Sequence, residues 1–147
     1  MKFDFEYEYS GQLVTVLSLK TNGNNRFRDF FSGIDNKTKS KLLARIETFS
    51  NTLGFQIRNK NIFKKLSGYK NIYEIILKDP VSIRILATRY DLDSNNTLIL
   101  LLGLYKTSEK SQTKHRNKYS QAEHLAKQIK ENKDELEQKL RRIYKRI

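Results

Sequence analysis

The architecture of the chain is set by the stretch from Phe63 to Lys110, FKKLSGYKNIYEIILKDPVSIRILATRYDLDSNNTLILLLGLYKTSEK. Its three apolar segments, separated by turn-forming residues, predict three consecutive β-strands. Isolated charged residues interrupt the strands at positions where neutral residues would form a sheet equally well. They are Glu74, Lys78, Arg84, Arg89 and Lys106. We therefore expect the sheet at 63–106 to carry the chemistry of the protein.

The expected pairing of the first two of these strands brings several charges together. Pro80 cannot donate a backbone hydrogen bond to a ladder, so it marks the turn between the strands. A turn symmetric about Pro80 pairs Ile76 with Arg84, and the period-2 alternation puts Glu74 and Lys78 on the same face. The sequence thus predicts that Glu74, Lys78 and Arg84 gather on one face, whereas a shift of one residue would separate them.

The segments on either side of the sheet complete one expected domain at 1–147. Residues 1–20 alternate aromatic with polar side chains and then become β-branched, which predicts a strand hairpin. Residues 25–54 carry apolar residues at helical spacing, which predicts an N-terminal helical hairpin covering the sheet. The run at 98–105 is apolar on both faces and indicates a central, buried strand. Residues 116–147 predict one long basic helix whose last two turns project. The expected fold class is α+β, with a twisted, mainly antiparallel sheet.

The composition of the 147-residue chain excludes several classes of function. There is no cysteine, so disulfides, thiolate metal sites and cysteine nucleophiles are excluded. The two histidines have no metal-ligand spacing, so no zinc site is expected. The longest apolar run falls far short of the roughly 20 residues of a membrane helix, and the first residues show no signal-peptide pattern. We expect a cytoplasmic protein with no metal, no cofactor and no membrane partner.

The positive charge of the chain is unevenly distributed. The net charge is +13, but residues 1–19 carry one lysine against three carboxylates. Residues 54–90 carry eight Lys and Arg against two carboxylates, and residues 105–147 carry thirteen against six. The basic charge therefore lies on the central strands and the C-terminal helix. This distribution is typical of a protein that binds a polyanion, most often nucleic acid, and the alternative is a merely basic surface.

Arg84 and Lys106 are the candidate phosphate ligands. A guanidinium in the middle of a strand is costly to bury and has the shape for a bidentate phosphate contact. The alternative for Arg84 is a salt bridge to Glu74 or Asp79, and the two roles are compatible. Lys106, at the end of the buried strand, binds phosphate or is simply solvated. The cations near Glu74 favour an electrostatic or positioning role for it over proton transfer, and Lys78 is the fourth candidate.

Further basic residues border the expected site, and for each of them the alternative is an ordinary surface charge without a role in binding. The candidate RNA-binding residues are Lys64, Lys65, Lys110, Lys114, His115 and Arg116. His115 and His124 are acid–base groups by type, and packing or exposure is the alternative for His124. Tyr105 and Tyr119 are candidates for base stacking, with core packing as the alternative.

Five short motifs along the chain resemble, in order, those of the RelE/ParE superfamily of toxins from type II toxin–antitoxin modules, and the details are closest to its HigB-like, phage-derived branch. Phe63–Gly68 resembles the "K-x-L-x-G" before the family's second strand, Ile72–Ile75 resembles "lyEl", and Ile83–Leu86 resembles "yRil". Leu101–Thr107 resembles "LLhgFxKK", and Gln121–Glu123 stands where the family's last helix begins its "A-xx-A" run.

This resemblance implies a small RelE-like fold and an activity. Such toxins are mostly metal-independent endoribonucleases, and many cleave mRNA on the ribosome. The 2′-hydroxyl attacks the adjacent phosphate, basic side chains stabilise the anionic phosphorane, and an acid protonates the leaving 5′-oxygen. By position, Arg84 matches the family's phosphate-binding arginine and Lys106 its basic residue after the last strand. The implied partners are mRNA, the ribosome and a cognate antitoxin, of helix-turn-helix type.

Two positions depart from the family pattern and leave a second class of function open. The family often has Arg or Lys where Ile76 stands, and a second Lys where Thr107 stands. Lys78 is the expected substitute for the first of these cations. The alternative function is that of a non-catalytic nucleic-acid- or ribosome-binding protein, or of a ParE-like gyrase inhibitor.

Overall fold

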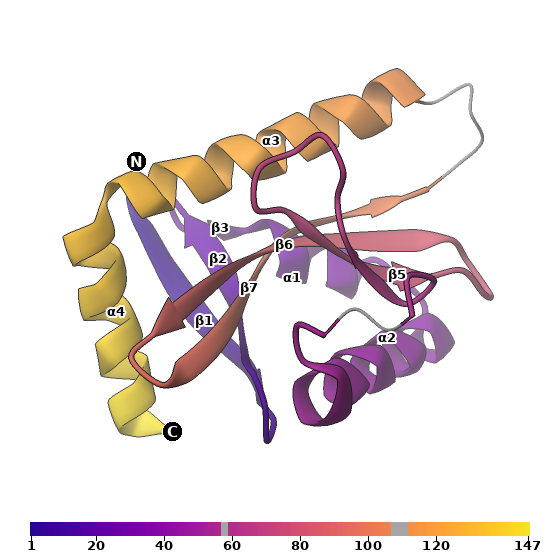
Figure 1. Cartoon of the computed structure of the whole chain (residues 1–147). Coiled ribbons are helices and arrows are strands. Elements are labelled where there is room, and N and C mark those ends of the chain that lie inside the picture. Colours follow the sequence, from indigo (N-terminus) through magenta and orange to yellow (C-terminus); the bar gives the residue numbers. More distant parts are fainter. Residues whose placement is uncertain (57–58, 107–111) are drawn as a thin grey trace.

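The computed structural model describes residues 1–56, 59–106 and 112–147, which form an α+β fold around one mixed seven-stranded sheet (Figure 1). The strands are β1 (Phe3–Ser10), β2 (Thr15–Thr21), β3 (Asn24–Asn25), β4 (Phe63–Lys65), β5 (Tyr73–Leu77), β6 (Ile83–Leu92) and β7 (Asn95–Tyr105). The helices are α1 (Arg26–Ser32), α2 (Asn36–Thr48), the π-helical turn η1 (Phe49–Leu53), α3 (Gln112–Glu131) and α4 (Lys133–Arg146).

The strand order is β1-β2-β7-β6-β5-β4, and β3 pairs with the end of β2. The pair β2–β7 is parallel, and the other pairs are antiparallel. Strand β7 lies between β2 and β6, and the side chains from Leu98 to Leu102 are at most 2% exposed. The predicted α+β class, the mainly antiparallel sheet and the central buried strand are therefore confirmed.

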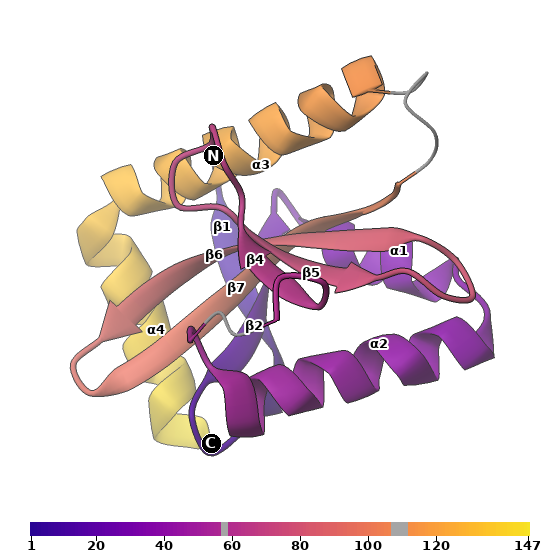
Figure 2. The ribbon, with the colours of Figure 1, turned by 45° about the vertical axis from the view of Figure 1, so that its right-hand side comes forward.

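Helices cover both faces of the sheet, which gives the molecule two hydrophobic cores (Figure 2). The core on one face joins α1, α2 and η1 to the sheet through residues such as Leu42, Ile46 and Ile85. The core on the other face joins α3 and α4 to the sheet through residues such as Leu86 and Ile129. Neighbouring residues of a strand alternate between these two cores because side chains alternate along a strand.

The helical pair at 25–54 is present, but it does not open the chain. Strands β1 and β2 come first and pair as the predicted hairpin. Asn25 and Asp35 then start α1 and α2, since their side chains accept hydrogen bonds from backbone N–H groups of the first helical turns. Gly54 follows η1 with a φ of 55°, a conformation that favours glycine.

The prediction of one long helix at 116–147 is wrong. The helix begins earlier, at Gln112, and breaks at Asn132, where α4 turns away from α3 along the sheet (Figure 1). Leu136 and Leu140 of α4 are fully buried, so the last turns pack against the protein and do not project. The apolar stripe of α3 continues on α4, but on α4 it packs against a different part of the sheet.

Polar contacts hold α4 against the turn between β6 and β7. Arg141 Nη1 lies 2.7 Å from the Asp93 carboxylate in that turn, and the Tyr90 hydroxyl of β6 donates a hydrogen bond to Glu137. In addition, Lys139 donates to the backbone carbonyl of Phe3 in β1. The end of the chain is thereby fixed to two strands and one turn, which explains why a straight continuation of α3 is not observed.

Gly103 allows α1 to pack closely on β7. A Cβ atom at this position would lie 2.3 Å from Cδ1 of Phe30, far inside van der Waals contact. The Phe30 ring in turn packs on Tyr105, with the ring centroids 5.1 Å apart. Tyr105 thus contacts α1, on the opposite side of the sheet from α3.

We expect Gly103→Ala to lower the free energy of unfolding by about 1–3 kcal/mol, because the methyl group must displace the Phe30 ring. Urea denaturation measures this change. Gly33→Ala is the matched control, since a Cβ there would meet no atom closer than 3.6 Å. Equal stability of the two variants would contradict the close packing of α1 on β7.

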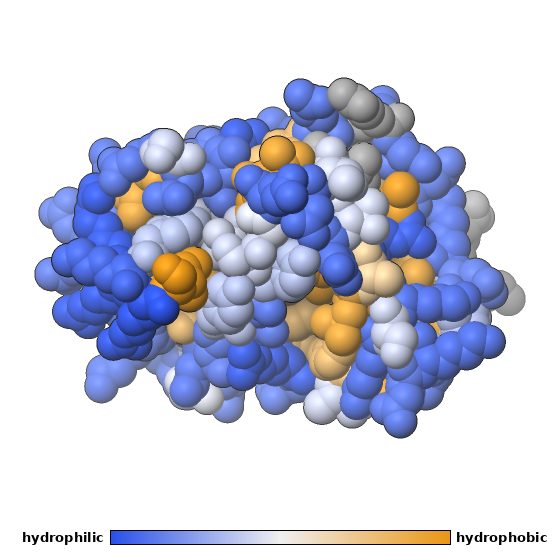
Figure 3. Space-filling model, turned by 90° about the horizontal axis from the view of Figure 1, so that it is seen from below, coloured by the Kyte–Doolittle hydropathy of each residue, from blue (hydrophilic) through white to orange (hydrophobic). Residues whose placement is uncertain are grey.

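The surface is mostly polar, and the face in Figure 3 shows small hydrophobic patches among hydrophilic residues. The large hydrophobic side chains that are most exposed are spread over the chain and include Tyr7, Leu13 and Leu43. None of the helices in the described ranges combines the length and apolar composition that crossing a membrane requires.

Candidate phosphate-binding site

The pairing of β4, β5 and β6 places three predicted charges on one face of the sheet. Strands β5 and β6 pair with Ile76 opposite Arg84, so the predicted register is confirmed. Strand β4 adds Lys64 opposite Glu74. Leu86, which also pairs with Glu74, belongs to the core under α3. Because paired residues share a face, Lys64, Glu74 and Arg84 lie on the side of the sheet that α3 covers.

Helix α3 and the end of β7 supply the second half of the site. His115 and Tyr119 are four residues apart and therefore share one face of α3. Both are buried, with 6% and 7% of their surface exposed. Lys106 follows the last residue of β7, and its Nζ donates a hydrogen bond to the Tyr119 hydroxyl at 3.1 Å. We name as the polar cluster the residues Lys64, Glu74, Arg84, Lys106, His115 and Tyr119.

Arg84 is buried without a negative partner among the described residues. It is 9% exposed, and its Nη1 donates hydrogen bonds to three neutral oxygens, the Ile83 carbonyl at 3.0 Å, Ser82 Oγ at 3.3 Å and the Leu77 carbonyl at 3.5 Å. The two carboxylates considered as partners, Glu74 and Asp79, form their ion pairs with lysines. A buried guanidinium that lacks a counter-charge destabilises the fold, and it is the arrangement expected where an anion binds.

Glu74 is the one carboxylate of the polar cluster, and it is fully buried. Its Oε1 lies 3.5 Å from Lys64 Nζ, and neither of its oxygens accepts a hydrogen bond from a described residue. Burial, and next the negative charge of Glu74, raises the pKa of Tyr119 to about 12. The Tyr119 phenol therefore keeps its proton at neutral pH. Glu74 acts on the cluster through its charge.

The pairing of β6 with β7 brings the second phosphate candidate next to the first. The backbone N–H of Lys106 donates to the Ser82 carbonyl at 2.9 Å, two residues before Arg84. Lys106 and Lys64 are partly exposed, whereas Arg84 lies deeper. The cluster thus holds three Lys and Arg side chains and one carboxylate, Glu74. This excess of positive charge, partly desolvated, suits one bound phosphate group.

Lys78 does not join this group. Strand β5 ends at Leu77, so the alternation that would carry Lys78 to the face of Arg84 stops one residue too early. The Nζ of Lys78 donates to Asn61 Oδ1 at 3.0 Å, and the residue lines a hollow together with Lys41 of α2. Lys78 therefore does not provide a cation beside Ile76, which is itself apolar and 3% exposed.

The other predicted RNA-binding residues are dispersed around the cluster. Lys65 and Arg116 are exposed, on β4 and α3 respectively. Lys114 belongs to the first turn of α3, and Lys110 lies outside the described residues, as does Thr107. His124 is also exposed, on the side of α3 away from the polar cluster, where it lines a separate cavity.

Tyr119 is the residue whose place in the site could not be assigned from its type alone. A tyrosine at this position predicts base stacking or core packing, whereas the hydroxyl accepts a hydrogen bond from Lys106 and the ring packs on Tyr69 with centroids 5.5 Å apart. The useful signal is its spacing of four residues from His115, which puts both polar groups on the buried face of α3.

Comparison with known proteins does not assign a function to the chain, so the function must be inferred from the geometry of the polar cluster. Within the described ranges, no group of three His, Asp or Glu side chains is arranged to hold a metal ion. No family model matches the chain, and no curated protein matches it either. The cationic character of the polar cluster is therefore the starting point for a function.

Proposed function

We propose that the chain is the toxin of a type II toxin–antitoxin module, a metal-independent endoribonuclease that cleaves mRNA on the ribosome and binds the scissile phosphate at the polar cluster. The finer fold assignment, a RelE-like fold of the HigB-like branch, is part of this proposal and is supported by the order of the five motifs. The proposal includes a cytoplasmic location and a small antitoxin of helix-turn-helix type as partner.

The observation that carries the proposal is Arg84, a buried guanidinium whose described hydrogen bonds all go to neutral oxygens. Lys106 stands beside it and is held by the Tyr119 hydroxyl. A phosphate bound here would supply the missing negative charge and accept hydrogen bonds from both cations. RNA would enter at the edge where Lys64 and Lys106, the partly exposed members of the cluster, reach solvent.

The chemistry of such a site is stabilisation of charge. The 2′-hydroxyl attacks the adjacent phosphorus, the P–O5′ bond breaks, and the products are a 2′,3′-cyclic phosphate and a 5′-hydroxyl. The proton lost by the 2′-oxygen is balanced by the proton that the 5′-oxygen gains. Arg84 and Lys106 stabilise the extra negative charge of the phosphorane, and fixed cations in a buried site do this more effectively than water does. Tyr119 positions Lys106, and Glu74 positions Lys64 at the edge of the site.

The test is induced expression in a bacterial host, followed by mapping of transcript ends within minutes. The wild-type chain is expected to arrest growth and to produce new 5′-hydroxyl ends inside coding regions. Arg84→Ala is the control variant and should relieve both effects at equal protein level. Harmless wild-type protein with intact transcripts would refute the proposal.

A second function is favoured by one observation, the apolar Ile76 opposite Arg84, where a further cation would strengthen catalysis. A cluster with fewer cations binds phosphate but stabilises a phosphorane less well. The chain would then be a non-catalytic nucleic-acid- or ribosome-binding protein, or a gyrase inhibitor. Growth arrest with intact mRNA that survives Arg84→Ala would support this second function over the first.

A further inference from the structure

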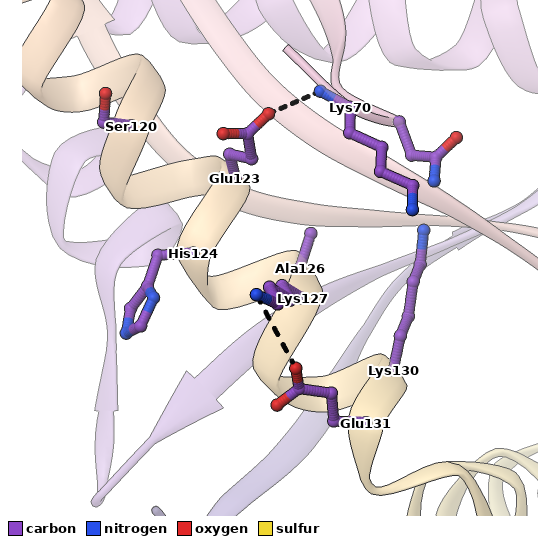
Figure 4. Close-up of a pocket in the computed structure, with 9 residues that line it drawn as sticks. Lys70, Ser120, Glu123, His124, Ala126, Lys127, Lys130 and Glu131 are labelled. Atoms are coloured by element: carbon purple, nitrogen blue, oxygen red, sulfur yellow. Dashed lines mark hydrogen bonds and ion pairs between the residues drawn. The ribbon is translucent and has the colours of Figure 1, made fainter.

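A cationic cavity lies beside the C-terminal half of α3 (Figure 4). Its volume is about 680 Å³, and it is formed between α3 and the loop that connects β4 with β5. Lys70 and Asn71 line it from the loop, and Lys127 and Lys130 line it from the helix. None of these residues belongs to the polar cluster. The cavity therefore needs an explanation of its own.

Two lysines converge in this cavity. Figure 4 shows the side chains of Lys70 and Lys130 pointing toward one another from the loop and from α3. Neither ammonium forms an ion pair with a carboxylate in the described part of the chain, although each is close to the other. Burial, and next the positive charge of Lys70, lowers the pKa of Lys130. In the free protein this pair of like charges is unfavourable, and an anion between them would remove the repulsion.

The carboxylates of the cavity are engaged with other groups. Glu123 Oε2 accepts a hydrogen bond from the backbone N–H of Lys70 at 2.5 Å, so it anchors the loop to α3. Glu131 pairs with Lys127, with Oε1 3.9 Å from Nζ, one turn along the helix. Figure 4 shows both carboxylates away from the two lysine tips, which are therefore left to a ligand.

Lys130 is held in place by a short chain of hydrogen bonds. Its Nζ donates to Thr88 Oγ1 at 2.8 Å, and the Thr88 hydroxyl donates to the Asn71 carbonyl at 2.8 Å. Thr88 is fully buried in β6, so this support is rigid. A lysine that is positioned in this way, without a counter-charge, is preorganised for an anion and gives up little side-chain entropy on binding.

We propose that the cavity is a second phosphate-binding site, which holds a backbone phosphate of an RNA strand between Lys70 and Lys130. The inference rests on the proposed function in one respect, the RNA origin of the phosphate. Lys130 lies eleven residues after Tyr119 on α3, about 16 Å along the helix axis. A single strand of several nucleotides spans this length, so one RNA can occupy both sites and be held in register for cleavage.

The test is the binding of a fluorescent, 2′-O-methylated oligouridine, which cannot be cleaved, at several salt concentrations. We expect Lys70→Gln and Lys130→Met each to reduce the slope of log K against log salt by about 0.7, the loss of one phosphate contact on a single strand. Lys127→Gln removes the same charge from the same cavity, but its ammonium is paired with Glu131, so the slope should stay at the wild-type value.

Three outcomes would overturn the site. They are an absence of oligouridine binding by the wild-type protein, an unchanged slope in Lys130→Met, and an equal reduction in all three variants, which would indicate diffuse attraction. Thermal unfolding distinguishes a lost phosphate contact from a lost fold. Lys130→Met removes a desolvated charge, so its melting temperature should be at or above the wild-type value. Inorganic phosphate at equal concentration should compete only weakly, and full competition would point to a free phosphate ligand and overturn the RNA origin.

The salt-dependence experiment can refute the second phosphate site without refuting the proposed function, and the reverse also holds. Oligouridine binding that depends on Lys70 and Lys130, in a chain that leaves transcripts intact, would retain the second site and refute the nuclease. Cleaved transcripts together with an unchanged salt slope would support the nuclease and refute the second site. Arg84→Ala should keep the contribution of Lys130 to the slope, because the two sites use different cations.

Discussion

Under the proposed function, replacing Arg84 by lysine should reduce single-turnover cleavage of ribosome-bound mRNA by about 10²- to 10³-fold, the usual effect of removing one preorganised donor to a developing anion. Lysine keeps the charge but loses the planar fork that contacts two phosphate oxygens at once. The guanidinium is held by the Ile83 carbonyl and Ser82 Oγ, and a shorter ammonium cannot reproduce these contacts and reach the phosphate. The rate of 5′-hydroxyl end formation measures the effect.

Arg89→Lys is the matched control for this prediction. Arg89 lies on the same strand, β6, but pairs with Asp91 and stacks on the Phe55 ring at 4.0 Å, outside the polar cluster. We expect its cleavage rate to equal that of the wild type within experimental error. A similar loss in both variants would mean that general positive charge, and not a phosphate site at Arg84, supports the activity.

Replacing Leu136 by alanine should lower the free energy of unfolding by about 2–5 kcal/mol. Leu136 is fully buried in the core that α4 shares with the sheet, and its truncation leaves a cavity there. The measurement is urea denaturation, with the m-value expected to stay constant. The size of the effect distinguishes a docked α4 from a helix that continues α3 into solvent.

Leu43→Ala provides the comparison for Leu136→Ala. Leu43 is also a helical leucine, but it is 52% exposed on α2, so its truncation should change the stability by no more than about 0.5 kcal/mol. If Leu136→Ala were equally mild, the packing of α4 against the sheet would be contradicted, and the single long helix expected from the sequence would be the better description.

The polar cluster has a physical logic that suits a binding site better than a structural core. Glu74 and Arg84 are both buried, yet the ion pair of Glu74 is with the partly exposed Lys64, and the hydrogen bonds of Arg84 go to neutral oxygens. The desolvation of such groups destabilises the free protein. An anion held by Arg84 and Lys106 would recover part of this energy on binding. The buried charges lower the stability of the free protein, and the same charges are in place to bind an anion.

The sequence by itself determined the strands that carry the site and their register. Period-2 alternation and one proline were sufficient to pair Ile76 with Arg84, because strand pairing across a short turn depends on local residues. The same alternation wrongly extended to Lys78, since where a strand ends depends on its neighbours. The charge pattern also indicated Arg84, Glu74 and Lys106, because a charged residue within or at the end of an apolar strand is visible in the local sequence.

Only the tertiary structure decided which charges meet and where the last helix goes. The step of seven residues from Ile129 to Leu136 is compatible with one continuous helix, and α4 turns because β1 and β6 offer it an apolar surface and Asp93 in the β6–β7 turn pairs with Arg141. The contacts of Lys106 with Tyr119, and of Lys130 with Thr88, join segments that are distant in the chain. Such partners are set by packing across the sheet, and no local pattern encodes them.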